Sequence, residues 1–276
     1  MLQWFITGVA HCIQLLTSED MKLYYRETGQ GQPIIILHGL FGAGDNWLSV
    51  ARLLEEEYRV ILPDARNHGQ SPHSDDFSYT AMAADLNELL DELDLESALF
   101  VGHSMGGKAA MNFAVSAPER VQKLAVVDIA PKYYPVHHQT ILKAYSEIDL
   151  DQLKSRGDAD KAMAAYIKDI STRQFLLKNL TRNDSGGFDW KHNLPVIREQ
   201  IENVGEPLPE NARYEKPALF IAGSQSDYIQ RQDHPAIKQL FPKARIETIQ
   251  EAGHWVHAEK PEEVVQLLTG LFNETD

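Results

Sequence analysis

The sequence predicts an α/β fold in which helices cover both faces of a mostly parallel central sheet. Short β-rich runs alternate with helical patterns along the chain after Met21, and this alternation is typical of such a sheet. The strand candidates are almost continuously apolar, as strands buried on both faces are. A chain of 276 residues is long enough to bury one large core.

The individual elements follow from these apolar runs and from the helical spacing between them. A first strand is expected to start at Met21, and further strands at 33–37, 58–62, 99–101, 124–129, 218–221 and 246–249. Helices are expected at 46–57, 79–93, 105–117, 234–241 and 261–272. Asp45 and Ser78 stand where two of these helices would have their N-caps.

One long segment breaks the alternation. Residues 131–216 contain several helical patterns and no strand-like run, and they are too long for a loop in a compact domain. We expect a helical cap, inserted after the sixth strand, over the carboxyl ends of the strands, where open α/β sheets bind ligands. Residues 21–130 and 217–276 then form the core. A second independent domain is less favoured, because both ends of the segment join strands.

Composition excludes some classes of partner. The formal net charge of −14 argues against binding to nucleic acid or to an anionic membrane surface, since both are polyanions. The single cysteine, Cys12, allows no intrachain disulfide and no metal site built from cysteines. This cysteine usage suits a reducing compartment, so we expect a cytoplasmic protein.

Residues 1–20 are treated separately. Their apolar stretch at 2–16 has no preceding Lys or Arg and no small-residue cleavage site after it, which argues against a secretory signal. The stretch is also shorter than the roughly 20 apolar residues that a membrane-spanning helix needs. We interpret residues 1–20 as an N-terminal extension without a role in catalysis. A peripheral amphipathic segment is the alternative.

The segment Gly102-His103-Ser104-Met105-Gly106-Gly107 lies between an apolar run and a helical one. This pattern predicts a nucleophile elbow, a tight strand-to-helix turn that exposes a serine hydroxyl beside a general base. Gly102 and Gly106 let the strand and the helix pass close together, because neither has a Cβ. Ser104 is therefore the predicted nucleophile.

A serine nucleophile needs a histidine that accepts its proton and passes it to the leaving group. His254 follows the last strand and precedes the last helix, so we expect it on a loop at the carboxyl edge of the sheet. Serine first and histidine last is the chain order of this hydrolase architecture. His257 is the alternative, whereas His137, His138 and His192 fall in the cap and are interpreted as solvated side chains.

The carboxylate that orients the imidazole has two candidates. Asp128 ends the strand before the cap, and Asp227 follows the strand at 218–221. Hydrolases of this architecture usually carry the acid one position before Asp227, where this chain has Ser226. Asp128 is therefore favoured, and Asp227 is the alternative. Asp64 is interpreted as part of a turn held by a local carboxylate–arginine pair.

A tetrahedral intermediate also needs hydrogen-bond donors for its oxyanion. The backbone N–H of Met105, directly after the nucleophile, is one candidate. The other is the N–H of Leu40, in the glycine-containing loop that follows the strand at 33–37. Phe41 and His38 of the same loop are expected at the substrate pocket.

Together, these motifs resemble the α/β-hydrolase superfamily, and within it the capped bacterial esterase branch of abhydrolase-type serine hydrolases. The resemblance covers residues 21–276 and rests on the segments 38–42, 66–69, 102–108, 127–131, 174–178 and 253–261. It implies a serine esterase that hydrolyses carboxylic esters through an acyl-enzyme, with acyl-CoA thioesters as a further substrate class and with no cofactor or metal. The branch has an aspartate matching Asp128 and lacks the usual later acid, but this chain carries Asp227 as well.

Other activities share this arrangement of residues. A C–C bond hydrolase or a cofactor-free haloperoxidase would use the same triad, and a non-catalytic binding protein could keep the fold with an idle site. Ser104 argues against haloalkane dehalogenases and epoxide hydrolases, since these need a carboxylate nucleophile at the elbow. The intact Ser104 and His254 argue against the binding protein.

Overall fold

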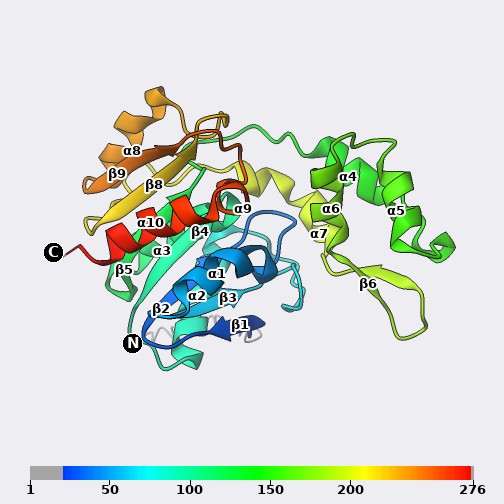
Figure 1. Ribbon diagram of the computed structural model, residues 1–276, viewed down its shortest axis with the longest axis horizontal. Helices are drawn as coiled ribbons and strands as arrows, with labels where there is room; N and C mark the ends of the chain where they lie inside the picture. Colours follow the sequence, from blue (N-terminus) through cyan, green and yellow to red (C-terminus); the bar gives the residue numbers. More distant parts are fainter. Residues whose placement is uncertain (1–20, 275–276) are drawn as a thin grey trace, which may run out of the picture.

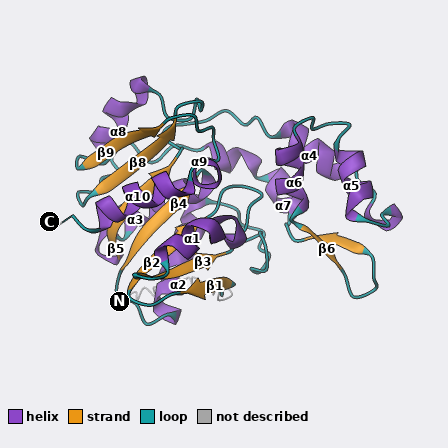
Figure 2. Ribbon diagram, viewed as in Figure 1, coloured by secondary structure: helices purple, strands orange, loops and turns teal. Residues whose placement is uncertain are grey.

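The structure is a computed structural model that describes residues 21–274. Its centre is a seven-stranded sheet with the order β1-β3-β2-β4-β5-β8-β9 (Figures 1 and 2). Neighbouring strands of this sheet pair in parallel, except that β1 runs antiparallel to β3 at one edge. The predicted mostly parallel α/β fold is therefore confirmed. The interpretation of residues 1–20 lies outside the described residues.

The strands of the sheet fall where the apolar runs predict them, although β1 begins at Tyr25 rather than at Met21. Every residue of β4 and β8 is buried, as expected for strands that are covered on both faces. The bounds are Tyr25–Thr28 (β1), Gln32–Leu37 (β2), Tyr58–Pro63 (β3), Ala98–His103 (β4), Val121–Val127 (β5), Ala218–Gly223 (β8) and Ala244–Ile249 (β9).

Helices cover the two faces of this sheet. Helices α1 and α10 pack together on one face, and α2, α3 and α8 contribute to the core on the other (Figure 1). These helices span Leu48–Leu54 (α1), Tyr79–Glu92 (α2), Met105–Ser116 (α3), His234–Leu240 (α8) and Pro261–Phe272 (α10), and the short α9 spans Val256–Glu259. Short 3₁₀ helices lie at Gly44–Trp47, Pro118–Arg120, Leu150–Gln152, Ile201–Gly205 and Arg231–Asp233.

The segment between β5 and β8 extends to one side of the sheet, at the right of Figure 1. It contains α4 (Gln139–Ser146), α5 (Arg156–Met163), α6 (Ile170–Leu177), β6 (Leu180–Arg182), β7 (Phe188–Trp190) and α7 (Leu194–Glu199). The expected insertion point after the sixth strand was wrong. The segment follows β5, the fifth strand, because a single antiparallel strand precedes the parallel ones.

The expectation that this segment has no strand was also wrong, because β6 and β7 form an antiparallel pair. Each has three residues, which is too short for an apolar run to reveal. The turn that joins them contains Gly186 at a φ of 84°, and the N–H of Asn183 bonds to the carbonyl of Gly187. The division of the chain into a core and a cap at residues 131 and 216 stays a prediction.

Of the two predicted N-caps, one is confirmed. The Ser78 hydroxyl accepts a hydrogen bond of 3.2 Å from the N–H of Ala81, at the start of α2. The prediction for Asp45 was wrong, because the chain enters a 3₁₀ helix at Gly44, two residues before the expected helix start. Ala43 is the N-cap there, and the Asn46 side chain accepts its backbone N–H at 2.8 Å.

Arg66 does not pair with Asp64, contrary to the prediction. Its guanidinium makes bidentate bonds of 2.6 and 2.7 Å to Asp85 of α2, and both side chains are buried. The Asp64 carboxylate instead accepts the backbone N–H groups of Gly44 and Gln70 at 2.7 and 2.8 Å. Backbone donors thus satisfy Asp64, whereas the buried guanidinium requires a charged partner from another element.

Helix α3 crosses β4 at very short distance. A Cβ added at Gly102 would lie 2.3 Å from the carbonyl oxygen of Gly106, and a Cβ at Gly106 would lie 2.5 Å from that of His38. Both contacts are with backbone, which cannot rotate away as a side chain can. The two glycines are therefore required by the close approach of β4, α3 and the loop after β2.

We expect Gly102→Ala to lower the free energy of unfolding by roughly 1–3 kcal/mol, because the added methyl group overpacks a fully buried site. Gly270→Ala is the matched control, since a Cβ there meets no atom within 4 Å. That change, in an exposed turn of α10, should raise the free energy of unfolding by about 0.5–1 kcal/mol. Urea titration of both variants measures the effects, and an unchanged stability of Gly102→Ala would contradict the packing argument.

Candidate active site

Ser104 occupies a sharp turn between β4 and α3. Its φ of 52° and ψ of −117° are rare for a residue with a side chain. Its N–H donates to the carbonyl of Val127 at 3.1 Å, and its carbonyl accepts the N–H of Lys108 at 3.0 Å. The turn therefore fixes the backbone on both sides of the serine while the residue stays partly exposed.

His254 and Asp128 lie in direct contact. The imidazole Nδ1 is 2.7 Å from Oδ2 of Asp128, which is fully buried directly after β5. The same carboxylate accepts the N–H of Gly223 at 3.1 Å and the hydroxyl of Ser226. Asp128 thus has donors from three directions, which compensate the cost of burying its charge.

Neither of the two alternatives that the sequence leaves open takes part in this pair, although His257 lines the same cavity as Ser104. Asp227 is exposed, and its carboxylate accepts a hydrogen bond of 3.5 Å from the Gln230 side chain. His257 is buried, and its ring stacks on Trp47 at a centroid distance of 4.2 Å. Burial lowers the pKa of His257 to about 3. The structure therefore brings Asp128, and not Asp227, to His254.

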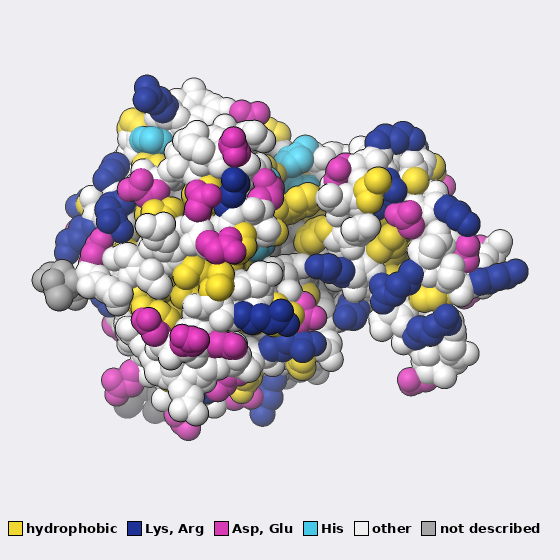
Figure 3. Space-filling view, in the orientation of Figure 1, with side chains coloured by type: hydrophobic (Ala, Val, Ile, Leu, Met, Phe, Trp, Pro, Cys, Tyr) yellow, Lys and Arg dark blue, Asp and Glu magenta, His cyan; other side chains and the backbone are white. Residues whose placement is uncertain are grey.

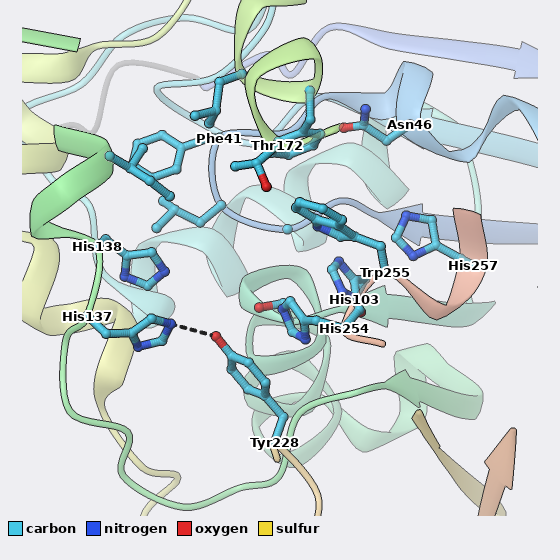
Figure 4. Close-up of a pocket in the computed structure, with 16 residues that line it drawn as sticks. Phe41, Asn46, His103, His137, His138, Thr172, Tyr228, His254, Trp255 and His257 are labelled. Carbon is cyan, nitrogen blue, oxygen red and sulfur yellow. Dashed lines mark hydrogen bonds between the residues drawn. The ribbon is translucent and has the colours of Figure 1, made fainter. Parts of the chain in front are cut away.

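Further side chains hold the His254 imidazole in place. The ring of Tyr228 stacks on it at a centroid distance of 3.9 Å and an interplanar angle of 15°. The Tyr228 hydroxyl contacts Nε2 of His137 at 2.9 Å (Figure 4). On the other side, Nε2 of His103 bonds to the backbone carbonyl of His254 at 2.8 Å. His137 comes from the segment between β5 and β8, which we call the insertion, so the insertion contributes to the position of His254.

The loop after β2 presents a free backbone N–H beside Ser104. Phe41 has a φ of 59°, and its own N–H donates to Nε2 of His68 at 3.2 Å. Among residues 21–274, no hydrogen-bond acceptor meets the N–H of Leu40, which lines the same cavity as Ser104. Met105 is the first residue of α3, where a helix leaves its N–H without an intrahelical partner. Two donors are thus available near the serine.

His38 does not line the cavity, contrary to expectation. It is buried behind the loop, where its Nδ1 contacts the carbonyl of Gly39 at 2.8 Å and its Nε2 accepts the N–H of Ala65 at 2.9 Å. Burial lowers its pKa. His38 supports the loop, whereas Phe41 lines the cavity.

A cavity of about 230 Å³ lies beside Ser104, between the sheet and the insertion. Figure 3 shows histidine and hydrophobic side chains gathered in this hollow, and Figure 4 shows the lining residues. Its walls come from the loop after β2, from the start of the insertion, from α6, and from the loops that carry Tyr228 and His254. The lining includes Phe41, Asn46, His138, Ile141, Thr172, Phe175, Leu176 and Trp255.

Sequence reasoning missed several of these residues. His192 is buried and not solvated, whereas His138 is half-buried and lines the cavity, with its Nδ1 buried and without a partner among the described residues. The sequence did contain a signal for a role of Ser226, since this residue occupies the position where related folds carry the acid. Tyr228 had none, because its role depends on a ring contact across the loop.

Within residues 21–274, no cluster of three or more His, Cys, Asp or Glu side chains is arranged to hold a metal ion. No helix in that range combines the length and the apolarity needed to cross a membrane.

Comparisons with known proteins identify the family of the chain. A family model described as the alpha/beta hydrolase fold matches residues 32–156. The chain is 39% identical to the sn-1-specific diacylglycerol lipase ABHD11 of Mus musculus, over 87% of this chain and 80% of that protein. It is 38% identical to the esterase YbfF of Escherichia coli, over 92% of this chain and all of the relative.

Solved structures extend the similarity to three dimensions. A marine microorganism esterase superposes with a TM-score of 0.89 and 42% identity, and the match covers 91% of this chain and 99% of that one. The chain therefore belongs to the α/β hydrolase family and, as its similarity to esterases and lipases implies, it is a carboxylic ester hydrolase.

Proposed function

We propose that the protein is a serine esterase that forms an acyl-enzyme on Ser104, with His254 as general base and Asp128 as the orienting carboxylate. The observation that carries this proposal is the hydrogen bond of 2.7 Å between His254 and Asp128, beside a serine on a strained turn. A serine, a histidine and a carboxylate in this relation are the parts that nucleophilic acyl transfer needs.

The proposed reaction proceeds in two halves. The Ser104 hydroxyl attacks the ester carbonyl while His254 accepts its proton, and the backbone N–H groups of Leu40 and Met105 stabilise the oxyanion. His254 then protonates the departing alcohol, which leaves an acyl group on Ser104. A water molecule, activated by the same imidazole, hydrolyses this acyl-enzyme and releases the acid.

Asp128 is the proposed acid because of what surrounds it. A buried carboxylate that accepts bonds from a backbone N–H, a hydroxyl and an imidazole is held in one position, and so it can orient the imidazole and stabilise the imidazolium that forms. The exposed Asp227 has no comparable support. The comparison of these two environments favours Asp128.

Small-molecule carboxylic esters are the proposed substrates, since the relatives at 38–39% identity are named as an esterase and a lipase. An acyl-CoA thioester could form the same acyl-enzyme and is a further candidate substrate. A cytoplasmic location remains a prediction from cysteine usage. C–C bond hydrolysis, haloperoxidase activity and a purely binding role are the outcomes that would replace esterase activity if the following tests failed.

We expect Ser104→Ala to remove nearly all hydrolysis of p-nitrophenyl esters, because the nucleophile is lost while the fold is kept. The assay compares a series from acetate to palmitate, beside a panel of acyl-CoA thioesters. The wild-type serine should also react covalently with a fluorophosphonate probe, detected by mass spectrometry at Ser104. An active Ser104→Ala variant would refute the assignment, and an unlabelled Ser104 would favour the binding protein.

We expect Asp128→Asn to lower kcat by about 10⁴-fold, as loss of an orienting carboxylate does in serine hydrolases. Asp227→Asn is the matched control, since it makes the same change one loop away at an exposed side chain. It should change kcat by less than about twofold, in the way that isolated surface changes do. A severe effect at Asp227 together with a mild one at Asp128 would reverse the assignment.

We expect Ser226→Ala to lower kcat about 10-fold, which corresponds to ~1.4 kcal/mol, because Asp128 loses one hydrogen bond to its charged form. Ser224→Ala in the same loop removes a hydroxyl that accepts the N–H of Glu251 and does not touch Asp128. This control should keep wild-type kcat. Equal kcat values for the two variants would show that the Ser226 hydroxyl does not support the carboxylate.

A further inference from the structure

A second cavity meets the first one at Ser104. It has a volume of about 30 Å³, against about 230 Å³ for the cavity shown in Figure 4. The two share the walls formed by Leu40, Ser104 and Tyr228, together with His137 and His138 of the insertion. The serine hydroxyl therefore stands at a junction, with a small space on one side and a large one on the other.

The two cavities differ in the residues that line only one of them. His254 and Trp255 line the large cavity and do not line the small one. Met105 and Ile129 line the small cavity and do not line the large one. The imidazole thus belongs to the large side, whereas one of the two proposed oxyanion donors belongs to the small side.

This asymmetry determines how an ester must lie. In the tetrahedral intermediate, the carbonyl carbon carries the Ser104 oxygen, the oxyanion, the leaving alcohol oxygen and the acyl chain. The leaving oxygen has to face His254, because that imidazole gives it a proton. The alcohol therefore extends into the large cavity. The acyl chain takes the remaining direction, into the small cavity beside Met105.

We propose that the protein is selective for esters that join a short acyl group to a bulky, apolar alcohol. This inference rests on the proposed function, and it adds the substrate class. A water-sized group occupies on the order of 10–15 Å³ of such a cavity, so the small space holds about two or three heavy atoms beyond the carbonyl carbon. Acyl groups of about two to four carbons fit that space.

The large cavity has the character of an alcohol site for uncharged molecules. Phe41, Phe175 and Trp255 contribute to its walls, and the Phe175 and Trp255 rings lie 5.4 Å apart. Among the described residues that line it, none is Lys or Arg. A polyanionic leaving group such as coenzyme A therefore has no cationic partner there, which favours an uncharged alcohol over a CoA thioester.

Two isomeric esters test how the substrate is oriented in the two cavities. They have the same composition, but one has its long chain in the alcohol and the other has it in the acyl group. Hexyl acetate places two carbons on the acyl side, and ethyl hexanoate places six there. We expect kcat/KM of the wild-type protein to be at least ~10-fold higher for hexyl acetate, because several methylene groups of the other isomer meet a closed space. Equal rates, or faster hydrolysis of ethyl hexanoate, would overturn the inference.

The proposed function fails in a different way. If it is wrong, neither ester is hydrolysed and Ser104 does not react with the fluorophosphonate. If the substrate inference alone is wrong, Ser104 reacts, both esters are hydrolysed, and their ratio is equal or reversed. The two failures are therefore distinguishable in one set of measurements.

Enlarging the small cavity provides the second test. The double variant Val136→Ala/Val204→Ala shortens two half-buried side chains that line the small cavity and do not line the large one. It should raise the kcat/KM for ethyl hexanoate, relative to the kcat/KM for hexyl acetate, by ~10-fold. Ile141→Ala makes a comparable truncation in the large cavity and should not raise that ratio. The same rise in both variants would overturn the assignment of the acyl chain to the small cavity.

Discussion

The backbone turn at Ser104 is the constraint on which the other parts of the site depend. A residue with a side chain at a φ of 52° and a ψ of −117° costs on the order of 1–3 kcal/mol, so the surroundings must hold it there. The fully buried strand β4 and the backbone contact between Gly102 and Gly106 provide that support. Because the strands are parallel, the loops after β2, β5, β8 and β9 meet this turn at one edge of the sheet.

Helix α3 connects this turn to the insertion. Lys108 lies one helical turn after Ser104, is fully buried, and donates from Nζ to the backbone carbonyls of Lys132, Gly205 and Glu206. These carbonyls belong to the two ends of the segment between β5 and β8, and burial lowers the pKa of Lys108 to about 7. One helix therefore presents the serine and also holds the insertion that walls both cavities.

Sequence patterns predicted the parts of the molecule that local physics determines. The strands of the central sheet follow from apolar runs, and the proposed triad of Ser104, His254 and Asp128 was expected from the positions of these residues after strands. The pair formed by Arg66 and Asp85 could not be predicted, because it joins elements whose packing the sequence does not reveal. The strands β6 and β7 are too short to give a pattern.

The contacts that the insertion makes were the least predictable part of the site. His137 and His138 carry no local signal for a role, since their position depends on how the insertion returns to the sheet. Tyr228 reaches His254 through a ring contact, and it reaches His137 through its hydroxyl. Such contacts join three separate parts of the chain, so they arise only when the whole fold is in place.

The charge states of the side chains around the site also favour an uncharged substrate. Burial lowers the pKa of His138 to about 4 and keeps the pKa of His103 well below its usual range, so both rings are neutral at neutral pH. Asp128 is the buried carboxylate beside His254, and its hydrogen bond is directed at the imidazolium that forms there. A neutral ester enters such a site without a competing ion pair, and the charge that develops during attack meets backbone N–H donors already in place. The same desolvation that neutralises the histidines therefore strengthens the interactions that the proposed reaction requires.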